Sequence, residues 1–229
     1  MDYKPLQRIS RAVETLFGKS PPTLAKIPWS FIILIVAIGL AIPILVVRIG
    51  KMIDLPQIWI TLANSALKLL LTWGALRLRQ LSLRTIGLTL KDFPKETTIG
   101  VSLFLAFEAV RLLVFAVQGR VLMSISVDPS RVLDAAGQAL PCAFEEEVFY
   151  RGLVISFLLS QFQRWDLVAL ISSLIFALAH LHLGLSPLGL LNLTGSGVIY
   201  ALLYIWRGYN LTVPIVVHTL QNFVAILRS

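Results

Sequence analysis

The chain has 229 residues, of which 57% are hydrophobic and 14% charged, and its mean hydropathy is +0.82. This composition excludes an ordinary soluble domain and is typical of a polytopic membrane protein. Cys142 is the only cysteine, so an intramolecular disulfide and a cysteine-based zinc site are excluded. The net charge of +8 comes from basic residues concentrated beside apolar runs, where they set membrane topology, and we expect no nucleic-acid partner.

The first half of the chain predicts one surface helix and three membrane spans. Residues 1–26 carry basic and apolar side chains at helical spacing, which predicts an amphipathic helix on an anionic membrane surface. We expect this helix to be separate from a transmembrane domain over residues 27–229. Within that domain, the first three apolar runs are long enough to cross a bilayer, and they cover residues 27–47, 55–76 and 97–118.

Charged residues interrupt and separate these three runs. Lys68 lies within the second run and is expected to snorkel or to face the bundle. Glu108 and Arg111 are three residues apart in the third run, which favours an ion pair on one helix face. Residues 77–95, between the second and third runs, carry five basic residues and one acid and are expected to lie at the membrane surface.

The second half predicts four more spans. The run at residues 132–160 is too long for one simple span and contains Pro141, so we expect an irregular or amphipathic lead-in before the proline. The remaining predicted spans cover residues 167–183, 187–206 and 211–227. The predicted fold is therefore an all-α transmembrane bundle of about seven to eight helices.

Three consecutive glutamates, at positions 145–147, form an acidic stretch inside the fourth of these runs. Intramembrane charges are costly, and they usually face the bundle interior and mark a functional site. Glu147 and Arg151 are four residues apart, acid first, which favours an ion pair. Glu146 points about 100° away from Glu147 on a helix and is expected to be the free carboxylate. The alternative interpretation is a purely structural ion cluster at a helix end.

The three histidines all follow this acidic stretch. His218 and Asn222 are four residues apart and share a helix face. His180 and His182 point about 200° apart on a helix, so at most one of them is expected to join a site with Glu146. Two chemistries fit this set. A carboxylate and a histidine could activate water, or Glu146, His180 and His218 could bind zinc.

Three motifs in order resemble those of the CAAX prenyl protease and bacteriocin-processing (CPBP, or Abi) family of intramembrane proteases. They are Glu146-Glu147-x-x-x-Arg151-Gly152, Phe176-x-x-x-His180 and His218-x-x-x-Asn222. The resemblance covers roughly residues 135–227, whereas residues 1–130 match the family only in being membrane helices. It implies a bundle of about seven or eight helices.

The resemblance also implies a role for each motif residue. Glu146 would be the general base and His180 its partner in activating water. His218 and Asn222 would stabilise the oxyanion. Glu147 and Arg151 would form a supporting pair, next to Tyr150, which stands where the family usually has another aromatic residue. Because Asn is a poor zinc ligand, we favour a metal-free mechanism, with zinc on Glu146, His180 and His218 as the alternative.

The sequence thus predicts an intramembrane endopeptidase that hydrolyses a peptide bond of a membrane-associated or prenylated substrate. The alternative is a non-enzymatic membrane protein, such as a bacteriocin self-immunity factor or a scaffold. We expect a multi-pass integral protein, in contact with membrane lipid, in the plasma (inner) membrane of a prokaryote.

Overall fold

The computed structural model describes residues 24–118, 129–162 and 164–228, and every regular element within these ranges is helical. The predicted surface helix over residues 1–26 falls almost wholly outside the described residues. The described elements are α2 (Trp29–Met52), α3 (Gln57–Leu78), η1 (Leu83–Ile86), α4 (Phe93–Val117), α5 (Pro129–Glu146), η2 (Glu147–Val154), α6 (Ile155–Phe162), α7 (Trp165–Leu178), η3 (Leu181–Leu183), α8 (Pro187–Trp206) and α9 (Thr212–Arg228).

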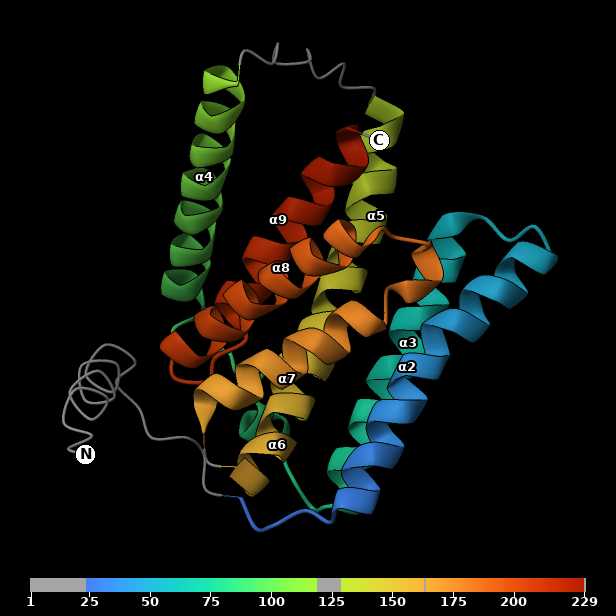
Figure 1. Cartoon of the computed structure of the whole chain (residues 1–229), viewed down its shortest axis with the longest axis vertical. Helices are drawn as coiled ribbons and strands as arrows, with labels where there is room; N and C mark the ends of the chain where they lie inside the picture. Colours follow the sequence, from blue (N-terminus) through green and yellow to red (C-terminus); the bar gives the residue numbers. More distant parts are fainter. Residues whose placement is uncertain (1–23, 119–128, 163, 229) are drawn as a thin grey trace.

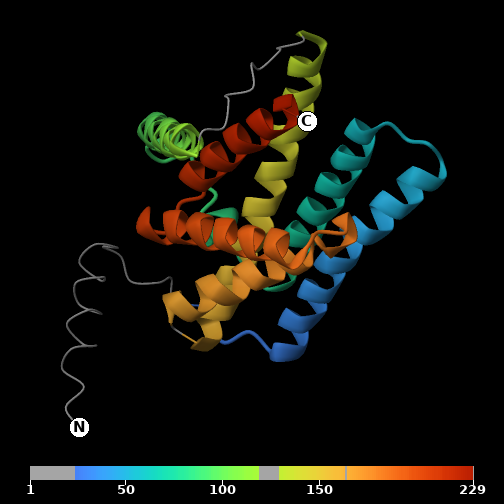
Figure 2. The same cartoon turned by 45° about the horizontal axis from the view of Figure 1, so that its top comes forward.

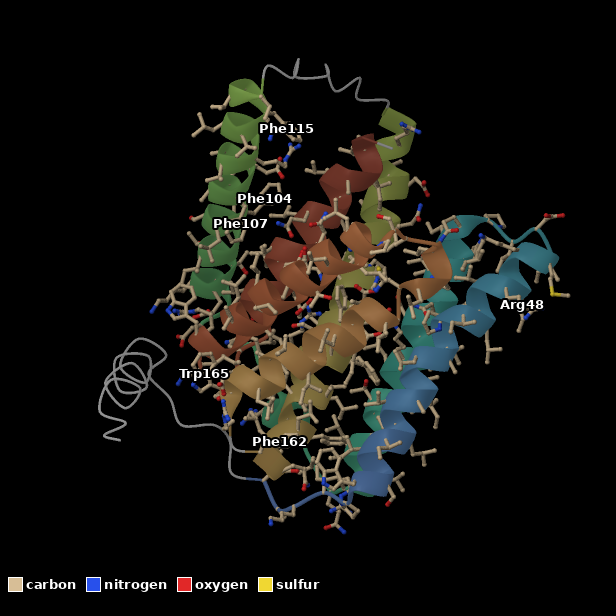
Figure 3. The ribbon with its side chains drawn as sticks, viewed as in Figure 1. Arg48, Phe104, Phe107, Phe115, Phe162 and Trp165 are labelled. Carbon is tan, nitrogen blue, oxygen red and sulfur yellow. The ribbon has the colours of Figure 1, made fainter. Side chains whose placement is uncertain are left out.

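The helices form an open bundle around the rod α5–η2–α6 (Figure 1). The hairpin of α2 and α3 lies on one side of the bundle and α4 on the other, and Figure 2 shows the same separation from a second direction. Between them, α3 and α9 pack against α5, and α7 packs against α8. The side of α4 that faces α9 carries Phe104 and Phe107 (Figure 3). Phe107 packs against the buried cluster formed by Tyr200, Leu203, Val213 and Val217.

Five helices in the described ranges are long and apolar enough to cross a membrane. They are α2, α3, α4, α7 together with η3, and α8, while α9 is apolar but shorter. Much of their apolar surface is exposed, including Leu113 on α4 and Leu70 on α3, as expected for helices that face lipid rather than water. The chain is thus a multi-pass integral membrane protein. These spans agree with the prediction of an all-α membrane bundle.

The rod α5–η2–α6 runs without interruption from Pro129 to Phe162, so the irregular form of the lead-in predicted before Pro141 is wrong. The amphipathic form is confirmed, because α5 is a regular helix with one apolar and one polar face. Pro141 lies inside α5, within the helix. Six residues later in the rod, the α-helix gives way to the π-helix η2, which is fully buried. Short π-helical stretches are rare and frequently occur at functional sites. Here the π-helix includes Glu147 and Arg151, the two residues of the predicted ion pair.

The segment between α3 and α4 is only partly at the surface, which corrects the prediction for residues 77–95. Ile86, at the end of η1, is fully buried, and its carbonyl accepts a hydrogen bond from the Tyr204 hydroxyl at 3.1 Å. Gly87 follows with a φ of +81°, and a Cβ there would lie 2.1 Å from the carbonyl oxygen of Tyr209. The basic composition of residues 77–95 predicts a surface segment. The buried part around Ile86 is only a few residues long, which is too short to alter that prediction.

Several predicted boundaries were displaced by a few residues. The first helix continues to Met52, five residues beyond the predicted end, because Arg48 and Lys51 are compatible with a helix although they end the apolar run. The fifth predicted span breaks after Leu178, where α7 ends, and the chain continues into η3.

Arg111 and Glu108 form the predicted pair, with Nη2 of the arginine 2.7 Å from Oε2 of the glutamate.

Candidate active site

Three consecutive buried glutamates at the junction of α5 and η2 organise the site. Neighbouring residues of a helix point in directions about 100° apart, so their carboxylates reach different sides of the rod. Glu145 faces α3, Glu146 faces two histidines, and Glu147 faces Arg151 and α9. The stretch therefore connects three neighbouring parts of the bundle.

The Glu146 carboxylate lies between two imidazoles. Its Oε1 is 3.4 Å from Nε2 of His180, and its Oε2 is 3.5 Å from Nε2 of His218. The side chain of Glu146 is 6% exposed and that of His180 is 18% exposed, which makes the His180 side the more open approach. A carboxylate and two ring nitrogens so close together in a buried place form an acid–base group suited to proton transfer.

His180 lies just after α7 and is fixed by the backbone of that helix. Its Nδ1 is 2.8 Å from the carbonyl oxygen of Phe176, and a carbonyl only accepts hydrogen bonds, so Nδ1 donates. This interaction turns Nε2 toward Glu146. His182 instead bonds through Nδ1 to the carbonyl of Ala179, and its ring stacks beside that of His180 at 6.4 Å. One of the two histidines meets Glu146, but the helical angle used to predict this does not apply, because both lie beyond the end of α7.

Glu147 holds both Arg151 and His218. Its Oε1 lies 3.0 Å from Nη1 of Arg151, which confirms the predicted pair. The same oxygen accepts a hydrogen bond of 2.8 Å from Nδ1 of His218. A carboxylate that accepts a hydrogen bond from one ring nitrogen of a histidine fixes the tautomer of the ring and stabilises its protonated form. Glu147 therefore orients His218, a role that the i, i+4 spacing to Arg151 did not reveal.

Aromatic rings pack against both partners of Glu147, which are His218 and Arg151. The ring of Tyr200 stacks on that of His218, with centroids 4.5 Å apart and planes 15° from parallel. The guanidinium of Arg151 lies over the rings of Phe176 at 4.5 Å and Tyr200 at 5.2 Å. The Tyr200 hydroxyl donates to Oε1 of Gln221. Sequence reasoning missed Tyr200; an aromatic residue one helical turn after the small residues Gly195 and Gly197 of α8 was the available signal.

The other two predicted residues contact the site differently. Tyr150 is fully buried, and its ring meets Phe176 edge to face at 5.3 Å. Its backbone carbonyl accepts a hydrogen bond from Ser172. Asn222 is half-buried, one turn beyond His218 on α9, and has no hydrogen-bond partner among the described residues. Of the predicted catalytic set, Glu146, His180 and His218 therefore lie together, while Asn222 lies at the edge of the set.

Residues 129–224 match the family model described as type II CAAX prenyl endopeptidase Rce1-like. We call residues 129–224, which are similar to this family, the Rce1-like segment. The match confirms the resemblance indicated by the three motifs and covers less than half of the chain. It includes Glu146, His180, His218 and Asn222, whereas α2, α3 and α4 lie outside it. Comparison with curated proteins and with solved structures gave no match.

One helix outside the Rce1-like segment reaches the acidic stretch. Lys68, in the middle of α3, has its Nζ 3.1 Å from Oε1 of Glu145, and Asn64 donates to the same oxygen at 2.9 Å. The side chains of Lys68 and Glu145 are 2% and 0% exposed. Lys68 thus faces the bundle, one of the two orientations expected for it. The partner on Glu145 was not predicted, because the two residues are 77 positions apart.

The described residues contain no group of three or more His, Cys, Asp or Glu side chains arranged to hold a metal ion. In the zinc alternative, Glu146, His180 and His218 would supply the ligands. The two Nε2 atoms face different oxygens of Glu146, and Nδ1 of His218 is bonded to Glu147. Histidines that bind zinc commonly donate Nδ1–H to a carboxylate or a carbonyl in this way, so Glu146, His180 and His218 remain the ligands of the zinc alternative.

Proposed function

We propose that the protein is an intramembrane endopeptidase in which Glu146 and His180 activate a water molecule. The observation that carries the proposal is the buried Glu146 carboxylate between the Nε2 atoms of His180 and His218. The family match supports a peptidase and therefore a protein substrate. The substrate that fits the motifs is a membrane-associated or prenylated protein. Its scissile bond reaches the site from the side of the bundle that faces lipid.

In the first step, Glu146 takes a proton from water as the water oxygen attacks the scissile carbonyl. His180 has its Nδ1–H fixed on the Phe176 carbonyl, so its Nε2 is the atom that exchanges a proton with Glu146. The proton then passes from this pair to the leaving amine. A positioned acid–base group of this kind contributes roughly 10²–10⁴-fold to a rate.

His218 stabilises the negative charge that develops on the carbonyl oxygen. With both ring nitrogens protonated, Nδ1–H is donated to Glu147, and Nε2–H, which faces Oε2 of Glu146, is the donor to the oxyanion once Glu146 has taken the proton from water. Arg151 in turn neutralises Glu147, and the stacked ring of Tyr200 fixes the plane of the imidazole. Asn222 adds an amide donor from the same face of α9. Losing one oxyanion donor typically costs about 10²–10³ in rate.

The two neighbouring histidines provide a matched test of the proposal. We expect His180→Ala to lower hydrolysis of an internally quenched, farnesylated CAAX peptide by at least about 100-fold, because Glu146 loses its proton partner. His182→Ala is the control, since His182 bonds to the backbone and does not face Glu146. Both purified variants are assayed in detergent. Activity of His180→Ala above about a tenth of the wild-type value would overturn the assignment.

Chelation tests the metal-free form of this mechanism. Because the described side chains form no three-ligand group, we expect activity on the same peptide to survive prolonged treatment with a strong zinc chelator. The protein is assayed before and after treatment, with elemental analysis of both samples. Stoichiometric zinc, with activity lost on its removal and restored on its return, would contradict the metal-free mechanism in favour of Glu146, His180 and His218 as ligands.

A further inference from the structure

Lys68 is the one charged residue of α3 that lies buried against the acidic stretch, in the part of the chain that the structure describes. It lies outside the Rce1-like segment, and its Nζ contacts the first of the three glutamates. Asn64, one turn earlier on α3, donates to the same oxygen. The ammonium also lies 5.2 Å from the centre of the Tyr150 ring. A buried amine and carboxylate at this separation form a pair that is costly to break.

The pair matters because Glu145 and Glu146 are adjacent. Two ionised carboxylates on neighbouring residues of a buried helix repel each other, so one of them tends to take up a proton. Glu147 has Arg151 as its own cation. In the part of the chain that the structure describes, the cationic partner of Glu145 is Lys68. Without the lysine charge, the ionised Glu145 and Glu146 would repel each other, and Glu146 would be ionised in a smaller fraction of molecules.

We propose that Lys68 is a positioning residue of the active site, which holds Glu145 against α3 and balances its charge so that Glu146 stays ionised between the two histidines. This inference rests on the proposed function. Other groups facing the two glutamates are Asn64 from α3, Cys142 from α5, Tyr150 from η2, His180 after α7 and His218 from α9. None of these groups carries a permanent positive charge.

A double variant distinguishes a charge-balancing role of Lys68 from a merely structural one. Lys68→Met leaves Glu145 unpaired beside Glu146, and Glu145→Gln leaves the Lys68 charge free to attract Glu146 away from the histidines. Each single change should therefore lower kcat. The double change Lys68→Met/Glu145→Gln removes both charges, keeps an acceptor for Asn64, and should restore kcat.

The first measurement is the kinetics of farnesylated CAAX peptide hydrolysis by the full-length protein in detergent. We expect each single variant to lose at least about tenfold in kcat with little change in KM, and the double variant to return to within about threefold of wild type. Arg111→Met is the matched control, because it removes the cation from an intramembrane pair on α4, remote from the site. Wild-type kcat in both single variants would overturn the proposal, as would a double variant no better than either single variant.

The second measurement does not depend on activity. A hydrophobic carbodiimide reacts with protonated carboxylic acids in apolar surroundings, and mass spectrometry reports labelling of the peptide containing residues 145–147. We expect Lys68→Met to raise this labelling at least about threefold, Glu145→Gln not to raise it, and the double variant to match wild type. Equal labelling in wild type and Lys68→Met would overturn the proposal. If Lys68→Met does not fold, kcat and labelling of Glu145→Gln decide, and wild-type kcat in that variant overturns it.

The two measurements also separate this inference from the proposed function. If the wild-type protein fails to cleave the peptide while the labelling pattern appears, the proposed function fails and the charge balance between Lys68 and Glu145 stands. If the wild-type protein cleaves the peptide and neither kcat nor labelling responds to Lys68, the proposed function stands and the positioning role fails.

Discussion

Glu146→Gln is expected to abolish peptide hydrolysis while leaving the protein folded. The amide has almost the same shape as the carboxylate and still contacts His180 and His218, but it does not accept a proton from water. Loss of a general base typically costs about 10²–10⁴ in rate. We therefore expect kcat on the farnesylated CAAX peptide to fall by at least about 100-fold.

The stability of the same variant is the control for this result. Glu146 has no permanent cation as its partner in the described structure, since Lys68 pairs with Glu145 and Arg151 with Glu147. The melting temperature of Glu146→Gln in detergent should therefore lie close to the wild-type value. Activity above about a tenth of wild type would contradict the role of Glu146 as base. A large loss of stability would indicate that its role is structural.

Glu147→Gln is expected to lower stability sharply, in contrast to the neighbouring change. It leaves Arg151 without a carboxylate in a position where its side chain is 0% exposed. Breaking a buried pair by removing one partner costs on the order of 3–5 kcal/mol. For a domain of this size that corresponds to a fall in melting temperature of roughly 10 °C. Thermal unfolding in detergent measures the effect.

A second change at the partner position separates the two roles of Glu147. Glu147→Gln/Arg151→Met removes the orphaned charge, so it should recover part of the lost melting temperature. It should not recover activity, because His218 still lacks the carboxylate that holds its Nδ1–H. A double variant that melts no higher than Glu147→Gln would show that the ion pair contributes no stability. A double variant with wild-type kcat would contradict the orienting role of Glu147 on His218.

The local part of the site was predictable from the sequence because it depends on helical spacing. Glu147 and Arg151 are four residues apart on one continuous rod, and the pair that this spacing predicts is present. The separation of Glu146 from that arginine follows from the same geometry. Five of the seven apolar runs likewise predicted membrane helices, since the length of a run relates directly to bilayer thickness. The runs at 132–160 and 211–227 are not among the described helices that are long and apolar enough to cross a membrane.

The long-range part of the site was not predictable from spacing. The contact between Lys68 and Glu145 depends on how α3 packs against α5, and the stack of Tyr200 on His218 depends on how α8 meets α9. His180 was expected within a helix, yet it lies after the end of α7, where hydrophobicity gives no boundary signal. The buried Ile86 was missed because the residues around it are basic.

Cleavage of a membrane-associated protein through Glu146, as proposed above, can be tested directly without a known substrate. Cells that produce the wild-type protein are compared with cells that produce Glu146→Gln at the same level, and the protein termini in their membrane fractions are identified by mass spectrometry. We predict at least one membrane-associated protein with a new terminus that is present only with the wild-type protein. Identical sets of termini in the two cells would contradict the proposed peptidase and favour a non-enzymatic role.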